Sequence, residues 1–293
     1  GPQGSGKTMS ARCIAGILPP LTEEESIEIT KIYSVVGMLD EKEPLIRRRP
    51  FRSVHHTATK AALIGGGLIP RPGEISLAHG GVLFLDELPE FRKGVLEVLR
   101  QPLESRSIQL SRTYGNYSFP ADFMLVAAMN PCPCGCYPDM ERCTCTPAQI
   151  QAYIGRISQA FIDRIDLCAE SSRIGFEDLT GCGKAESSEA IRSRVCRARE
   201  VQTQRYTGEI RTNSMLTGED LKKYCELDQK GRKLMETAFT VMKMSARSYH
   251  RILRVARTVA DLAGEEKIRE EHLGEAIGYR MVDRKYWGRQ QAW

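Results

Sequence analysis

The first eight residues of the chain have the types and the spacing that bind a phosphate group. They fit the pattern G-x-x-x-x-G-K-[ST] and comprise Gly1, Pro2, Gln3, Gly4, Ser5, Gly6, Lys7 and Thr8. The glycines let the backbone curl so that N–H groups point at phosphate oxygens, and the helix expected next adds the positive end of its dipole. Lys7 is expected to reach the β- and γ-phosphates and Thr8 to place its hydroxyl on Mg²⁺. The alternative is a glycine-rich turn without a ligand.

An acidic pair about eighty residues further on completes this chemistry. Asp86 and Glu87 follow Val82 to Leu85, a continuous apolar run of strand length. A phosphate loop needs an acid at the end of a neighbouring strand, so Asp86 is expected to hold Mg²⁺ through water. Glu87 is expected to act as the general base toward the attacking water. An acidic pair of this kind also commonly caps a strand-to-helix turn, but the two patterns in this order favour nucleotide hydrolysis.

The chain has 10 cysteines, a high number, and several are concentrated in one segment. Cys132 and Cys134 form one C-x-C pair, and Cys143 and Cys145 form a second. Four thiolates can hold Zn²⁺ tetrahedrally and stabilise a loop that lacks a core of its own. Cys136 is a spare candidate ligand, and a set of reduced thiols is the alternative. No histidine or carboxylate joins the set at ligand spacing, so a catalytic metal is not expected.

The hydrophobic pattern predicts alternating strands and helices, followed by helices alone. In the first part we expect helices at residues 9–18, 23–36 and 93–103, strands at 82–85, 123–129 and 165–169, a hairpin of 107–110 with 116–119, and irregular chain over 40–60. In the second part we expect helices at residues 188–205, 218–226, 229–242, 246–263 and 270–280, with Thr217 and Ser245 as N-caps. The prediction is an α/β domain with a mainly parallel sheet at 1–180, a connecting helix at 181–205 and an all-helical domain at 206–293.

Composition limits the class of protein. Apolar residues make up 41% and charged residues 27% of the chain, as in an average soluble protein. No apolar run approaches the roughly 18 residues that span a bilayer, and no charged-then-apolar leader is present, so we expect a cytoplasmic protein without a membrane partner. The net charge of +5 permits a nucleic-acid partner without predicting one.

Five stretches of sequence carry a family resemblance, at residues 50–56, 70–88, 129–135, 163–167 and 245–251. On these the chain resembles the magnesium-chelatase-like AAA+ ATPases of the ComM (YifB) family. The resemblance implies the AAA+ P-loop fold with a helical lid, ATP and Mg²⁺ as ligands, and assembly of the chain with itself into a ring, a hexamer.

The resemblance also assigns roles to single residues. Asn130 matches sensor 1, which helps to orient the water beside the γ-phosphate; a strand-end turn before Pro131 is the alternative. Arg164 matches the arginine finger that reaches the ATP of a neighbouring subunit, an effect worth up to about 10³–10⁵-fold in such enzymes. Arg247 matches sensor 2 in the lid, with Arg251 as a less favoured substitute. An arginine on a helix is otherwise most often a solvated surface residue.

The family resemblance implies a DNA motor, because proteins similar to this one drive branch migration of DNA joints. The expected hairpin at residues 107–119 carries Arg106 and Arg112 for phosphates and Tyr114 or Tyr117 for stacking on bases. An ordinary solvated hairpin is the alternative. Two other functions stay open: the ATPase subunit of a magnesium-chelatase-type metal-insertion complex, and an ATP-binding scaffold without turnover.

Two parts of the family pattern are not in this sequence. One is an N-terminal domain similar to that of Lon proteases, and the other is the strand that precedes the phosphate loop. We therefore expect the chain to be a piece of a longer protein.

Overall fold

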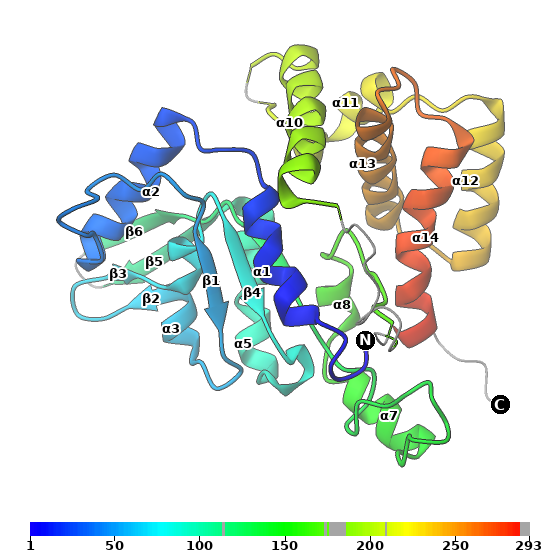
Figure 1. Cartoon of the computed structure of the whole chain (residues 1–293), viewed down its shortest axis with the longest axis horizontal. Helices are drawn as coiled ribbons and strands as arrows, with labels where there is room; N and C mark the ends of the chain where they lie inside the picture. Colours follow the sequence, from blue (N-terminus) through cyan, green and yellow to red (C-terminus); the bar gives the residue numbers. More distant parts are fainter. Residues whose placement is uncertain (113–114, 173–174, 176–185, 209, 288–293) are drawn as a thin grey trace. The chain divides into compact units, whose positions relative to one another are not determined.

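The computed structural model describes residues 1–112, 115–172, 175, 186–208 and 210–287 (Figure 1). The chain divides into two compact units. Unit 1 comprises Gly1–Phe161 with Ser171–Ala185, and unit 2 comprises Ile162–Glu170 with Glu186–Trp293. Within the described residues, every helix is too short or too polar to cross a lipid bilayer.

A parallel three-stranded sheet organises unit 1. Its order is β1 (Phe51–Val54), β4 (Val82–Leu85) and β7 (Met124–Ala127), with β4 in the centre. All four residues of β4 are buried, which explains its uninterrupted apolar run and confirms the expected strand. The register pairs Leu85 with Val54 on one side and with Ala127 on the other. Residues that follow the three strands therefore emerge together at one edge of the sheet.

Helices and two small antiparallel ribbons complete unit 1. The helices are α1 (Lys7–Ile17), α2 (Glu23–Val36), α3 (Lys60–Ile64), α4 (Glu74–Leu77), the 3₁₀ turn η1 (Leu88–Glu90), α5 (Lys93–Glu97), α6 (Arg100–Ser105), α7 (Pro147–Ile154) and α8 (Gln159–Ile162). The last residue of α8, Ile162, is the first residue of unit 2. The ribbons are β2 (Gly65–Gly66) with β3 (Arg71–Pro72), and β5 (Ser107–Arg112) with β6 (Gly115–Pro120). The expected hairpin is thereby confirmed.

Three sequence predictions were wrong. Residues 40–60 are not irregular throughout, because β1 and the start of α3 lie there. The single helix expected over 93–103 is two short helices, α5 and α6. Residues 165–169 form no strand; the Cys168 N–H donates to the Tyr279 carbonyl of a helix in unit 2 instead of to a strand partner.

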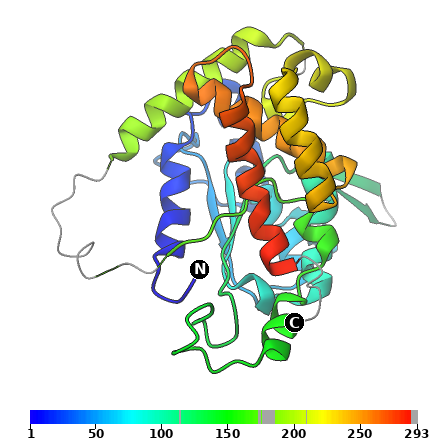
Figure 2. The same cartoon turned by 90° about the vertical axis from the view of Figure 1, so that its right-hand side faces the viewer.

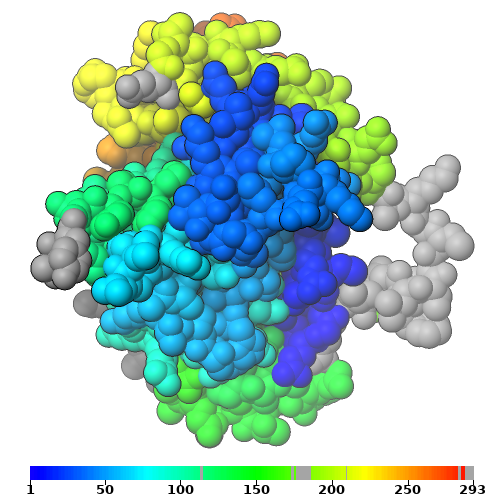
Figure 3. Space-filling model, turned by 90° about the vertical axis from the view of Figure 1, so that its left-hand side faces the viewer, coloured from blue at the N-terminus to red at the C-terminus, as the bar shows by residue number. Residues whose placement is uncertain are grey.

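Local sequence sets the bounds of α2. The Thr22 hydroxyl accepts the Glu25 N–H, the Glu25 carboxylate accepts the Thr22 N–H, and Gly37 ends the helix at a φ of 72°. A groove of about 570 Å³ runs along α2 beside β3 and β6, on the face of unit 1 in Figure 3, with Ile27 and Phe119 in its lining. This groove is lined by none of the residues of the phosphate loop.

Unit 2 is built from helices. They are α10 (Ser188–Arg205), the 3₁₀ turn η2 (Asn213–Met215), α11 (Gly218–Tyr224), α12 (Gln229–Met242), α13 (Ala246–Ala263) and α14 (Glu270–Trp287). One face of α13 is buried at Ile252, Leu253, Ala256 and Ala260, the spacing of an amphipathic helix. Helices α13 and α14 lie side by side, and α12 packs on α14 (Figure 2). Helix α10, expected to connect two domains, packs on α13 within this unit.

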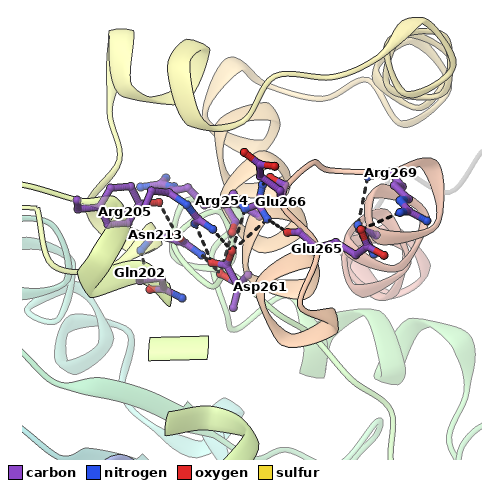
Figure 4. Close-up of polar contacts among 12 residues, drawn as sticks. Gln202, Arg205, Asn213, Arg254, Asp261, Glu265, Glu266 and Arg269 are labelled. Carbon is purple, nitrogen blue, oxygen red and sulfur yellow. Dashed lines mark hydrogen bonds and ion pairs between the residues drawn. The ribbon is translucent and has the colours of Figure 1, made fainter. Parts of the chain in front are cut away.

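A buried polar network joins α10 to α13 inside unit 2 (Figure 4). The Asp261 carboxylate accepts hydrogen bonds from Arg257 Nε at 3.1 Å, Arg205 Nη1 at 3.0 Å and Asn213 Nδ2 at 2.8 Å. The guanidinium of Arg257 also donates to the backbone carbonyls of Glu265 and Glu266. Every oxygen of this buried carboxylate is thus paired, as buried charge requires.

Candidate nucleotide site

The phosphate loop curls beside the carboxyl end of β7. Gly4 and Gly6 adopt φ values of 75° and 76°, which side chains with a Cβ rarely tolerate. The Gly1 nitrogen lies 3.1 Å from the Met129 carbonyl oxygen, so the start of the loop lies next to the strand end. Because Gly6 precedes α1 and offers no side chain, no side chain caps the first N–H groups of α1. This helix start is suited to phosphate oxygens.

Lys7 directs its ammonium group into the loop. Its Nζ donates to the carbonyl of Gly1 at 2.8 Å, to that of Pro2 at 2.6 Å and to Asn130 Oδ1 at 3.2 Å. Burial lowers the pKa of Lys7, and the charge of Asp86 partly offsets that effect. The structure therefore brings together the loop lysine and the polar residue expected as sensor 1.

Thr8 and Asp86, the two residues expected to hold magnesium, lie in direct contact. Thr8 Oγ1 donates to Asp86 Oδ2 at 2.7 Å, and Asp86 Oδ1 accepts the Glu87 N–H at 2.9 Å. A hydroxyl and a carboxylate are hard oxygen ligands of the kind that Mg²⁺ prefers. The donor set present thus fits the ion that the two sequence patterns predict.

Glu87 occupies a constrained position at the end of β4. Its backbone is left-handed, with φ 53° and ψ 49°, an uncommon state for a residue other than glycine and one that concentrates at functional sites. Its carboxylate is half-exposed, with 54% of the side-chain surface accessible, and lies 3.2 Å from His56 Nδ1. The candidate base is therefore open to solvent on one side and held by an imidazole on the other.

His56 and Ser171 are site residues that the sequence reasoning missed. His56 follows β1, whose register with β4 carries it to the Asp86–Glu87 edge. The position of His56 just after β1 could have indicated its place at this edge, but β1 itself was not predicted from the sequence. Ser171 Oγ lies 2.7 Å from Ser5 Oγ, beside the phosphate loop, and no local pattern indicates that contact.

The two arginines assigned by resemblance belong to unit 2. Arg164 follows α8 and is buried, with 9% of its surface exposed, whereas Arg247 is exposed in the first turn of α13. Arg251, the less favoured substitute, lies 3.6 Å from the Asp166 carboxylate, and burial lowers its pKa. The roles of Arg164 and Arg247 toward a nucleotide stay predictions.

The four cysteines of the C-x-C pairs converge in the loop that follows Asn130. Their Sγ atoms all lie within 4.8 Å of one another, in a set comprising Cys132, Cys134, Cys143 and Cys145. Cys136 lies outside this set, and its thiol donates to the Cys134 carbonyl at 3.6 Å. A metal can be held by these four thiols.

The candidate DNA-contacting residues of the β5–β6 hairpin differ in their exposure to solvent and in their ion pairs. Arg112 is exposed at the end of β5, and Tyr117 on β6 has 37% of its surface exposed. Arg106 lies 3.5 Å from the Asp122 carboxylate, so part of its charge is compensated. Tyr114 lies outside the described residues.

The fold and the site define the class of the protein. A parallel sheet flanked by helices, with a phosphate loop and an acid at the carboxyl edge, is the AAA+ P-loop arrangement followed here by a helical region. Residues 1–179 match the family described as magnesium chelatase, subunit ChlI, and residues 185–280 match its C-terminal region. The chain belongs to this magnesium-chelatase family, as the resemblance predicted.

Comparison with individual proteins gives the sequence identity and the length over which it extends. Competence protein ComM of Haemophilus influenzae is 46% identical over 97% of this chain and 55% of its own length. YifB of Salmonella typhimurium is 45% identical over the same shares. The magnesium-chelatase 67 kDa subunit of Heliobacterium mobile is 26% identical over 45% of this chain and 23% of its own length. The chain thus spans about half the length of the curated relatives it matches over nearly its full extent.

Proposed function

We propose that this chain is the ATP-hydrolysing part of a ring-forming motor that acts on DNA. The observation that carries the proposal is the meeting of the loop residues with the sheet edge, where Lys7 contacts Asn130 and Thr8 contacts Asp86. These contacts join segments more than seventy residues apart in the sequence, in the arrangement that P-loop ATPases use.

Each residue of the site has a defined task in hydrolysis. Lys7 and the N–H groups at the start of α1 bind and orient the phosphates, and Thr8 with Asp86 would hold Mg²⁺. When bound, Mg²⁺ neutralises charge that develops on the phosphate oxygens. Glu87 accepts a proton from the attacking water, and His56 holds that carboxylate in place.

The assignment to DNA has separate support. Competence protein ComM of Haemophilus influenzae is similar to this chain over nearly its whole extent. The β5–β6 hairpin presents an exposed arginine and a partly exposed tyrosine, Arg112 and Tyr117, which suit contacts to phosphate and to bases. A hexameric ring in which Arg164 serves the ATP of the adjacent subunit belongs to the same proposal.

The test is ATP turnover by the intact protein with and without single-stranded and branched DNA. We expect DNA to stimulate turnover in the wild type. We expect Glu87→Gln to bind ATP but to turn over about 10²–10⁴-fold more slowly, because the general base is lost. The matched control is Glu90→Gln, which removes a carboxylate in the next turn that pairs with Arg156 at 2.9 Å. Equal turnover in Glu87→Gln and Glu90→Gln would remove Glu87 from the mechanism.

The second candidate is the ATPase subunit of a metal-insertion complex. The observation in its favour is the match to the magnesium-chelatase family along both parts of the chain. Stimulation of turnover by a partner chelatase subunit, together with indifference to DNA, would favour it over the DNA motor. Tight ATP binding without turnover under all conditions would favour a scaffold.

A further inference from the structure

The geometry of the four clustered thiols matches a tetrahedral metal site. Cys132 Sγ lies 3.4 Å from Cys134 Sγ and 3.8 Å from Cys143 Sγ, and Cys134 Sγ lies 3.6 Å from Cys143 Sγ. A disulfide would require about 2.05 Å, so these cysteines are not paired covalently. A tetrahedron with Zn–S bonds of about 2.3 Å has edges of about 3.8 Å between sulfur atoms. The measured separations are thus close to those that one Zn²⁺ imposes.

The second half of the loop that carries these cysteines has no core of its own. Residues 128–146 contain neither helix nor strand, and residues 136–149 contain no buried side chain. Met140, the most apolar side chain of the loop's tip, is 71% exposed. A segment without a core of its own requires another source of stability, and a structural metal is one that small loops use.

Backbone groups around the sulfur atoms are arranged as in a metal-thiolate loop. The Tyr137 N–H donates to Cys132 Sγ at 3.4 Å, and the N–H groups of Cys136 and Thr144 hydrogen-bond to Cys134. Such N–H donors orient thiolate ligands and compensate their negative charge. An all-sulfur tetrahedral set selects Zn²⁺ over the hard cation expected at Thr8 and Asp86.

The same loop forms one wall of the phosphate loop. Asn130 lies two residues before Cys132, and the Gly135 N–H donates to the Cys132 carbonyl at 3.0 Å. Gly135 has a φ of 74°, and a Cβ added there would lie 2.9 Å from Cγ of Gln3. The cysteine loop therefore packs closely on the phosphate loop. A change in the shape of the cysteine loop would shift the positions of both Gln3 and Asn130.

We propose that Cys132, Cys134, Cys143 and Cys145 bind one structural Zn²⁺, and that this ion holds the loop against Gln3 and keeps Asn130 in reach of Lys7. The second part of the proposal rests on the proposed nucleotide site. The first part stands on the sulfur geometry alone, so the two are tested separately.

Metal content of the intact protein tests the zinc site. We expect about one Zn²⁺ per chain by elemental analysis, and its loss in Cys134→Ser and in Cys143→Ser. Cys136→Ser is the matched control, because it alters a thiol in the same loop that lies outside the set. If a cysteine variant fails to fold, the wild-type protein is stripped of metal with a chelator and Co²⁺ is added instead. We then expect the intense thiolate-to-cobalt absorption of a tetrahedral sulfur site.

Three results would overturn the zinc assignment. They are wild-type protein with neither zinc nor the cobalt absorption, equal metal loss in Cys136→Ser and Cys143→Ser, and iron in place of zinc. For the second part, removal of zinc should weaken binding of a fluorescent ATP analogue at least several-fold, with the affinity restored when zinc returns. Unchanged affinity without zinc would refute the link to Asn130 and leave the metal result intact, whereas absence of nucleotide binding even with zinc bound would refute the proposed function.

Discussion

Removal of one buried charge should loosen unit 2 by a predictable amount. The Asp261 side chain is 0% exposed, and its partners Arg257 and Arg205 are 2% and 18% exposed. Asp261→Asn keeps the shape of the side chain but removes the negative charge and turns an N–H₂ group toward arginine donors. Breaking a buried ion pair from one side costs about 3–5 kcal/mol, because the remaining charge stays buried and uncompensated.

This free energy converts into a rate of hydrogen exchange. If amides of α13 exchange through opening of unit 2, a loss of about 3–5 kcal/mol raises their exchange rates about 10²–10⁴-fold. We expect that increase in α13 and α14, and we expect the amides of β4 in unit 1 to exchange as before. Mass spectrometry of peptides from the two units measures both in one experiment.

The matched control removes a charge that is exposed. Glu265 pairs with Arg269 at 2.7 Å, and their side chains are 36% and 59% exposed (Figure 4). Glu265→Gln should therefore cost less than about 1 kcal/mol. If Asp261→Asn changes the exchange of α13 by less than tenfold, the buried network does not stabilise unit 2 as argued.

Three further outcomes are expected. Phe84→Ala, at a fully buried position of β4, should destabilise unit 1 by about 3–5 kcal/mol in urea unfolding, and a loss below about 1 kcal/mol would contradict the packing described. Lys7→Met should weaken ATP binding about 10- to 100-fold in calorimetric titration, since it removes a charged donor, whereas Lys31→Met on α2 should leave it unchanged. Burial raises the pKa of Cys225 to about 12 from its ordinary value of 9.0, so this thiol ionises at lower pH in the unfolded chain than in the folded one. The contribution of the neutral Cys225 thiol to the free energy of unfolding is therefore full below about pH 9 and is lost as pH rises toward 12. Between about pH 8 and pH 10.5, the free energy of unfolding should therefore fall less in Cys225→Ala than in the wild type. Cys13→Ala, which alters an exposed thiol, should follow the wild type. Parallel curves of unfolding free energy against pH for all three proteins would refute the argument.

Several elements were predictable to the residue, because their ends depend on neighbouring side chains. The bounds of α2, α10, α12 and α13 agree with the sequence prediction. Each begins after a residue whose side chain accepts an N–H of the first turn, namely Thr22, Ser187, Asp228 and Ser245. Thr217 lies at the predicted N-cap of α11, yet its side chain makes no capping hydrogen bond.

Short strands were predictable only where burial was complete. β4 has four apolar residues that are all buried, and its sequence pattern is plain. β1 has the same length, but Arg52 and Ser53 interrupt its apolar character, and it is identified only by its pairing with β4. A four-residue strand carries too few positions for a periodicity to stand out from the surrounding chain.

Local spacing is enough to identify the phosphate loop, the acidic pair and the two cysteine pairs, because each is a run of neighbouring residues whose types carry the chemistry. Which of these runs lie in contact depends on how the chain folds. The parallel register of β1, β4 and β7 brings His56, Asp86 and Asn130 to one edge of the sheet, and the fold of one loop brings four sulfur atoms within 4.8 Å. Such contacts between distant segments depend on strand pairing and packing, which no local pattern encodes.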